Sequence, residues 1–310
     1  MDERLTYTKK EAGLYLTGLF GQNLIYNIVT AGLYYYFQNV ICLPAMALGW
    51  IFAIARIWDA INDPMMGSIV DKTKSKWGKC KPYLLFAPLV VCVITCAAFL
   101  NGNYAVAKQE GNTSAMVLIV AWAAVSYILW GMSYTAGDVP LWGVISRMSE
   151  VEKDRANLIA LARIVASIAA GLGIVSVVAL SQAANKQFGE SENAQKGFIV
   201  VGIAMTVIAS LLFECAGLGV KERVPNSEET KTMKESFVLM WKCKPFRRLM
   251  ISGILRAPLQ LLATVVMTLF TYYYCDGDLT NAFSNGKTFL TIVIVGGAFS
   301  VSYTHLTLPT

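Results

Sequence analysis

The sequence predicts an all-α polytopic membrane protein whose helices form two bundles. Hydrophobic residues make up 55% of the chain and charged residues only 15%, whereas soluble domains carry roughly 25% charged residues. The mean hydropathy is +0.52. Eight runs are free or nearly free of charge, and each is close to the ~20 residues that cross a bilayer. Basic residues are shared unequally between the alternate loops that join these runs.

Six of the apolar runs come before a polar segment. We expect them to form one six-helix bundle over residues 1–219. Several contain glycine or proline, which membrane helices tolerate because neighbouring helices satisfy the freed backbone groups. In chain order they are residues 12–38, 45–70, 83–101, 114–145, 157–183 and 197–219.

Residues 220–245 are polar and charged, and they contain Pro225 and Pro245. We interpret them as a cytoplasmic linker between two bundles. Two further runs, residues 249–275 and 288–303, then begin a second bundle over residues 246–310. Two helices after the linker against six before it lead us to expect that this second bundle is incomplete in the sequence.

The loops differ sharply in basic residues. Nineteen of the 26 Lys and Arg residues fall on the side of the N-terminus, four on the other side and three within the runs. Because cytoplasmic loops carry the excess of Lys and Arg, we expect a multi-pass protein of the plasma (inner) membrane with a cytoplasmic N-terminus. This bias accounts for the net charge of +6, so the lipid bilayer is an expected partner and nucleic acid is not.

Residues for metal or covalent chemistry are sparse. The seven cysteines are scattered, with one close pair, Cys92 and Cys96, and the single histidine is His305. A zinc site or a disulfide framework is therefore not expected. We find no nucleophile–base pair and no phosphate-binding loop, so we expect neither an enzyme nor a cofactor.

The second apolar run carries the most informative charges. Arg56, Asp59, Asn62 and Asp63 follow 44 residues without any charge. Ionisable residues in a membrane span are costly and usually mark an ion or substrate path. At helical spacing Asp59, Asn62 and Asp63 share a face. Their oxygens are ligands of the kind that small hard cations prefer.

Charges on two other runs lie at a similar depth. Counted from the nearest charged loop at 1.5 Å per residue, Asp59 lies about 18 Å deep, Asp63 about 12 Å, Asp138 about 13 Å and Arg163 about 12 Å. We expect these groups to face a common cavity. The alternative is a set of structural ion pairs, but buried pairs often cost more in desolvation than they return.

The fourth run holds a second polar group. Thr135, Asp138 and Trp142 are spaced by one helical turn each and share a face. Asp138 and Arg163 can each form hydrogen bonds to two neighbouring hydroxyl groups. A Trp ring can pack on the C–H face of a sugar. Alone this is weak evidence for a sugar site, because Trp is also common at membrane interfaces. By the same reasoning we expect the aromatic cluster at residues 34–37 to lie in an aromatic belt.

Two long motifs resemble a known family. Residues 56–67 (RIWDAINDPMMG) followed by residues 71–82 (DKTKSKWGKCKP) form the first, and residues 127–135 (YILWGMSYT) with Asp138, Pro140 and Trp142 form the second. Both are similar to signatures of the glycoside–pentoside–hexuronide:cation symporters. These are the melibiose-permease-like branch of the major facilitator superfamily. The resemblance is good over residues 17–245 and loose over 246–300.

The resemblance implies a major-facilitator-type fold of two six-helix bundles that transports a sugar or glycoside together with a sodium ion, a lithium ion or a proton by alternating access. It implies a cation site or metal site at Asp59, Asn62, Asp63 and Thr135. It implies a substrate site at Tyr134, Asp138, Trp142 and Arg163. Relatives carry a Lys-Asp pair where this chain has Gln22 and Asn23. Asn23 can still bond a sugar hydroxyl, so we include it in the substrate site.

Two other functions remain open. The first is a transporter of the same fold for a lipid-like or other organic solute, which Asp138 and Trp142 argue against. The second is a membrane sensor, scaffold or fragment without transport activity. Asp59 and Asp63 argue against a scaffold, because a scaffold does not need unpaired buried acids.

Overall fold

The computed structural model describes residues 6–224, 235, 238, 241–248 and 251–252. The chain divides into two compact units, Met1–Ser227 and Glu228–Thr310. Nearly all described residues belong to the first unit, which is considered by itself below. The expected runs 249–275 and 288–303 and most of the linker 220–245 lie outside the described residues, so those expectations stay predictions.

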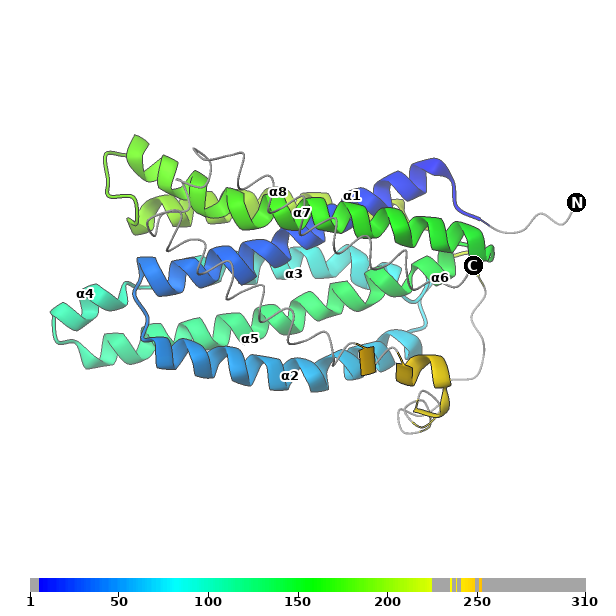
Figure 1. The fold of residues 1–310 in the computed structure, drawn as a ribbon, viewed down its shortest axis with the longest axis horizontal. Coiled ribbons are helices and arrows are strands. Elements are labelled where there is room, and N and C mark those ends of the chain that lie inside the picture. The colour runs from blue at the N-terminus through cyan, green and yellow to red at the C-terminus, as the bar shows by residue number, and fades with distance from the viewer. Residues whose placement is uncertain (1–5, 225–234, 236–237, 239–240, 249–250, 253–310) are drawn as a thin grey trace, which may run out of the picture. The chain divides into compact units, whose positions relative to one another are not determined.

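Six long helices run side by side in the first unit (Figure 1). The second to sixth apolar runs each lie largely in one of them, and the first run begins in α1 and continues beyond it. This agrees with the expected six-helix bundle, and two short helices join the ends of the long ones. No strand occurs among the described residues. The helices are α1 (Lys9–Asn27), α2 (Ala45–Lys72), α3 (Lys81–Phe99), α4 (Tyr104–Gln109), α5 (Thr113–Gly143), α6 (Ile145–Met148), α7 (Glu152–Gln187) and α8 (Gln195–Gly219).

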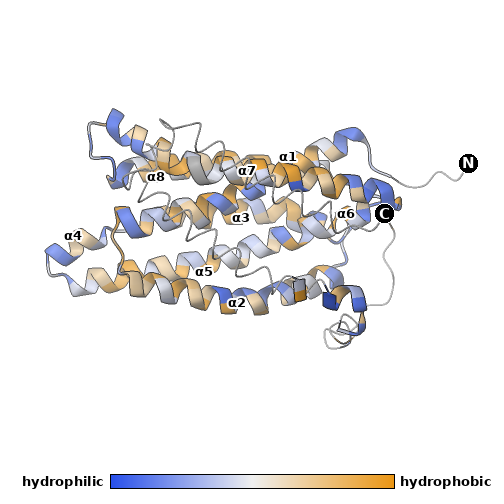
Figure 2. Ribbon diagram, in the orientation of Figure 1, coloured by the Kyte–Doolittle hydropathy of each residue, from blue (hydrophilic) through white to orange (hydrophobic). Residues whose placement is uncertain are grey.

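Five helical stretches of the described chain are long and apolar enough to cross a membrane: Ala45–Lys72, Lys81–Gln109, Thr113–Met148, Glu152–Gln187 and Gln195–Gly219. Figure 2 shows their apolar middle parts and the polar ends of the unit. The protein is thus an integral, multi-pass membrane protein. The first run is not one α-helix, because α1 is followed by the π-helical segments Ile28–Leu33 and Tyr36–Val40.

These π-helical segments change the position of the aromatic cluster at residues 34–37. Tyr34 is 42% exposed, but Tyr36 and Phe37 are fully buried. The Tyr36 hydroxyl donates to the Phe99 carbonyl oxygen at 2.9 Å, and its ring contacts those of Phe99 and Phe198. The expected aromatic belt is therefore wrong for Tyr36 and Phe37, which form part of the core between α1, α3 and α8.

Helix α1 packs against α7 and α8, α3 packs against α8 and α5, and α2 packs against α5. Close approach of α1 and α8 depends on glycine. A Cβ atom added to Gly18 would lie 2.3 Å from the Ala216 Cβ, and one added to Gly21 would lie 2.4 Å from the Ala209 carbonyl oxygen. Small residues at such contacts let membrane helices pack backbone to backbone.

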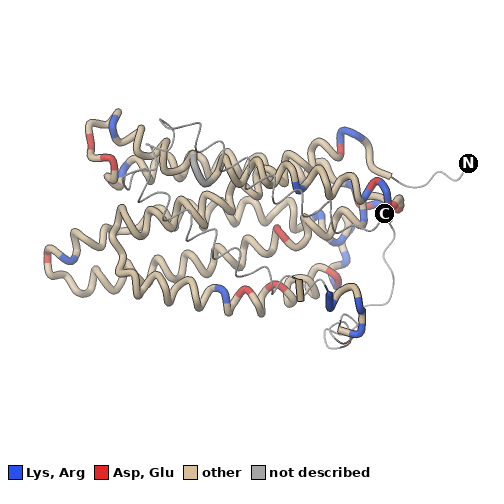
Figure 3. The backbone as a smooth tube through the Cα atoms, in the orientation of Figure 1, with Lys and Arg blue, Asp and Glu red and all other residues tan. Residues whose placement is uncertain are grey.

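In the first unit, basic residues gather at the end where α1 begins (Figure 3). There the Glu222 carboxylate accepts hydrogen bonds from the backbone N–H groups of Lys79, Cys80 and Lys81 at 3.0, 2.8 and 3.0 Å. An acid at this place complements the start of α3, since helix N-termini favour negative charge. Burial, and then the Glu222 charge, raise the pKa of the Cys80 thiol to about 12.

Candidate functional site

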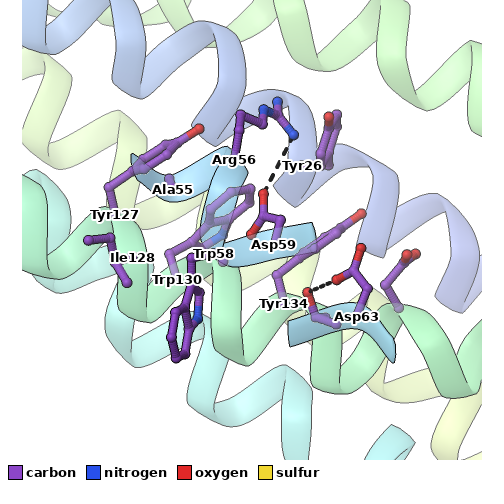
Figure 4. Close-up of a pocket in the computed structure, with 13 residues that line it drawn as sticks. Tyr26, Ala55, Arg56, Trp58, Asp59, Asp63, Tyr127, Ile128, Trp130 and Tyr134 are labelled. Atoms are coloured by element: carbon purple, nitrogen blue, oxygen red, sulfur yellow. Dashed lines mark hydrogen bonds and ion pairs between the residues drawn. The ribbon is translucent and has the colours of Figure 1, made fainter. Parts of the chain in front are cut away.

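A cavity of about 160 Å³ lies between α1, α2 and α5. Its walls carry three carboxylates, Asp59 and Asp63 from α2 and Asp138 from α5. Figure 4 shows Asp59 and Asp63 on neighbouring turns of α2, with the aromatic rings of α1 and α5 around them. The expectation of a common cavity is confirmed for Asp59, Asp63 and Asp138, but Arg163 is not among the residues that line it.

The two carboxylates of α2 have different partners. Asp63 Oδ1 accepts a hydrogen bond of 3.0 Å from the Thr135 hydroxyl of α5. Asp59 Oδ2 lies 3.6 Å from the Arg56 guanidinium, one turn earlier on α2. Gly131 faces Asp59, and a Cβ atom there would lie 3.2 Å from Asp59 Oδ1. This corner thus holds two acids, one hydroxyl and one guanidinium.

Asn62 does not belong to this corner. Its side chain is 4% exposed, it is not among the residues that line the cavity, and its Nδ2 has no hydrogen-bond partner among the described residues. Successive residues of an α-helix are turned by about 100° from each other, so Asn62 is rotated out of the direction of Asp63. The expectation of a shared face holds for Asp59 and Asp63 and is wrong for Asn62.

The oxygen atoms at this corner are of the type that small hard cations prefer. Within the described part of the chain, no group of three or more His, Cys, Asp or Glu side chains has the geometry of a metal site. The pair Asp59 and Asp63, with the Thr135 hydroxyl, instead offers hard oxygen ligands of the kind that alkali and alkaline-earth ions take. The assignment of Asp59, Asn62, Asp63 and Thr135 as cation ligands stays a prediction.

The predicted sugar residues cluster around Asp138. Its Oδ1 accepts hydrogen bonds from Gln22 Nε2 at 2.6 Å and Trp142 Nε1 at 3.1 Å. Gln22 Nε2 also contacts the Tyr134 hydroxyl. The Arg163 guanidinium lies over the Trp142 ring, 5.1 Å from its centroid. Tyr134, Asp138, Trp142 and Arg163 are thus neighbours, as expected of one site.

Asn23 is linked to Asp138 only through Gln22, in contrast to the direct place in the substrate site that we expect from the sequence. Its Nδ2 donates to the Leu19 carbonyl oxygen at 3.0 Å and to Gln22 Oε1 at 2.7 Å, and no hydrogen bond joins it to Asp138 among the described residues. Gln22, only 1% exposed, makes that contact instead. In the sequence, Gln22 and Asn23 are recognisable as two adjacent polar residues within an apolar run. The sequence does not reveal which of the two side chains faces α5.

Several aromatic residues of the cavity were also missed. Tyr26, Tyr127 and Trp130 line it together with Tyr134. The Trp130 and Tyr134 rings are stacked at 5.2 Å, and the Tyr26 centroid lies 5.4 Å from that of Tyr134. The spacing of Tyr127, Trp130, Tyr134 and Asp138 by three, four and four residues places them on one face of α5, and this spacing is the signal that was available.

Comparisons with known proteins identify a matching family and several relatives. Residues 14–305 match the model of a family described as MFS/sugar transport protein. The isoprimeverose transporter of Lactiplantibacillus pentosus is 27% identical over 69% of this chain and 42% of its own length. The inner membrane symporter YicJ of Escherichia coli is 28% identical over 80% of this chain and 50% of its own.

A lactose permease of Leuconostoc lactis is 28% identical over 59% of this chain and 28% of its own length. The chain spans between 42% and 59% of the first three curated relatives that it matches, or about half of their length.

Proposed function

The chain belongs to the MFS/sugar transport protein family, among the glycoside–pentoside–hexuronide:cation symporters, and from this we propose that it serves cation-coupled sugar transport. The solute is a sugar or glycoside, and the coupling ion is sodium, lithium or a proton. Transport proceeds by alternating access, in which two bundles rock around a central site. The transporter lies in the inner membrane with its N-terminus in the cytoplasm.

The observation that supports this function best is the charge of the cavity. Asp59 and Asp63 line one corner of it with Arg56, whose guanidinium lies 3.6 Å from Asp59, while the third carboxylate, Asp138, belongs to the sugar cluster. One positive charge against two negative charges leaves this corner with one excess negative charge. A single monovalent cation or proton neutralises it, and neutralisation matters because uncompensated charge is costly in a membrane interior.

The second ligand of the proposed transporter is bound around Asp138. A carboxylate that accepts N–H donors on Oδ1 can take sugar hydroxyl groups on its second oxygen. The Trp142 ring supplies an apolar face for the sugar ring, and Arg163, which lies over that ring, supplies further donors for hydroxyl groups. Charged donors and acceptors make the stronger hydrogen bonds, so Asp138 and Arg163 are the residues that hold the sugar.

Coupling follows from the position of both sites on α5. Thr135, which bonds Asp63, is one helical turn from Asp138. A cation that orders Asp63 and Thr135 therefore orders the part of α5 that carries the sugar site. Such coupling is reciprocal and amounts typically to a 5- to 150-fold change in affinity.

The test is sugar affinity of the full-length protein with and without sodium, with and without lithium, and at two pH values. Isoprimeverose and lactose, the sugars in the names of two relatives, are the first to try. We expect at least one cation to raise sugar affinity at least fivefold. Asp63→Cys should keep sugar binding and lose this stimulation, since its carboxylate contacts Thr135 and not the sugar cluster.

Asp138→Ala and Arg163→Ala are the matched variants for the other site. They should abolish sugar binding while the protein remains folded. A parent protein whose sugar affinity depends on none of the three cations would refute the symporter. An unchanged affinity in Asp138→Ala would refute the sugar site alone.

A further inference from the structure

A second hollow of about 420 Å³ lies near the loop between α2 and α3. It is a groove between α3 and α5 with a mostly apolar lining, to which Phe86, Ala87 and Val90 contribute. Its polar groups include the hydroxyls of Thr73 and Tyr83, which lie 2.7 Å apart. The groove shares no lining residue with the carboxylate cavity.

The side of α3 next to this groove is apolar and exposed. Phe86, Leu89, Val90 and Val93 are between 49% and 69% exposed, and they lie on one of the helices long and apolar enough to cross a membrane. Exposed apolar side chains on such a helix meet acyl chains in a bilayer. The groove therefore opens beside the hydrocarbon phase.

The loop at the end of the groove is basic. Lys72, Lys74 and Lys76 are exposed, and no carboxylate lies within ion-pair distance of them in the described part of the chain. Asp71, in the last turn of α2 before this loop, lies 3.5 Å from Arg147 instead. Trp77 is also exposed. Lysine clusters directly after a membrane helix attract anionic lipids, and exposed Trp is typical of the membrane interface.

We propose that this groove binds an anionic phospholipid. One acyl chain lies along the apolar walls of α3 and α5, and the phosphate group meets the lysines and the hydroxyls of Thr73 and Ser75. An inorganic phosphate would leave the apolar walls exposed. An apolar protein segment would leave three ammonium groups without a counter-charge. An anionic phospholipid satisfies both parts of the groove, and its binding does not depend on sugar transport.

The experiment measures how much phosphatidylglycerol, compared with phosphatidylcholine of the same acyl chains, the full-length protein retains in native mass spectrometry. We expect the parent to retain phosphatidylglycerol selectively. Lys74→Gln/Lys76→Gln should weaken retention about 25-fold, because each lysine near an anionic lipid contributes roughly a fivefold factor. Ala136→Leu, which fills the groove without a change of charge, should weaken it as well.

Lys9→Gln/Lys10→Gln is the matched control, since it removes two exposed lysines from the same end of the unit. It should leave retention unchanged. An equal loss in this control would mean that only the general charge of the membrane face matters, and the site would be refuted. Equal retention of both lipids by the parent would refute it too. A parent that retains neither lipid would mean that protein covers the groove, either another part of the chain or a second copy.

Discussion

Asp138 obtains both of its observed hydrogen bonds from uncharged donors. Gln22 and Trp142 donate to the same oxygen, Oδ1, and Gln22 is fixed in turn by Asn23. By the family resemblance, a lysine is expected at the position where this chain has Gln22. In this chain an amide orients the acid without neutralising it, which leaves the negative charge of Asp138 for Arg163 and for the donors of the proposed sugar.

The contribution of Gln22 can be measured by Gln22→Leu, which keeps the approximate volume and removes the donor. Hydrogen bonds to charged groups contribute about 1.5–3 kcal/mol. We therefore expect sugar affinity of the full-length protein to fall at least about tenfold in an equilibrium binding measurement. Asn23→Ala serves as the control, with a smaller loss because Asn23 acts through Gln22. A larger loss in Asn23→Ala would reverse the assignment of the two residues.

At the scale of the helices, the sequence predicts which residues form each helix better than it predicts how each helix is turned about its own axis. Long apolar runs define the six helices of the first bundle, because a helix buries its own backbone polar groups and needs only apolar side chains to cross lipid. Rotation depends on contacts between helices. The close approach at Gly18 and Gly21 sets how α1 lies against α8. That contact determines that Gln22, and not Asn23, faces Asp138, and residue spacing alone does not contain this information.

Gly21→Val tests this packing. A Cβ atom at Gly21 meets the Ala209 carbonyl oxygen at 2.4 Å, so α1 and α8 must separate. Overpacking of this kind costs about 1–3 kcal/mol, and we expect a clear drop in the thermal unfolding midpoint of the detergent-solubilised protein. Gly13→Val lies on the same helix with nothing within 4 Å and should have a much smaller effect. Equal midpoints of the two variants would contradict the packing argument.

A second contact ties the start of α1 to the segment after α8. The Glu11 carboxylate accepts hydrogen bonds of 2.7 and 2.9 Å from Arg223. Burial by itself would raise the pKa of Glu11, but the hydrogen bonds from Arg223 and Thr8 and the Arg223 charge lower it below its ordinary value of 4.5. Such a group stabilises the fold above its ordinary pKa, and the contribution is lost as the pH falls through the lowered value.

Glu11→Gln should therefore destabilise the protein at neutral pH, and the difference from the parent should shrink as the pH falls below about 4.5. The loss at neutral pH should be about 1.5–3 kcal/mol, the range for a hydrogen-bonded charged group. Thermal unfolding of both proteins between pH 3 and pH 7 provides the measurement. A difference that stays constant over this range would show that the charge of Glu11 does not contribute.

For the whole molecule, the distribution of charge decides the orientation in the membrane. Lys and Arg gather at the end of the first unit where α1 begins (Figure 3), while the loop between α3 and α5 carries only Lys108. Cytoplasmic loops hold the excess of basic residues. We therefore expect the basic end, and with it the proposed lipid site beside the loop between α2 and α3, to lie on the cytoplasmic side.

Single cysteines at positions 108 and 153, in a cysteine-free background of the full-length protein, test this orientation. Lys108 follows α3, and Lys153 lies in the first turn of α7 at the opposite end of α5; both are exposed. A membrane-impermeant thiol reagent added to whole cells should label position 108 and not position 153. Permeabilised cells should show labelling at both positions, which establishes that each cysteine can react. Labelling at position 153 but not at 108 would reverse the topology, because the basic loops would then face outward against the distribution that membrane insertion favours.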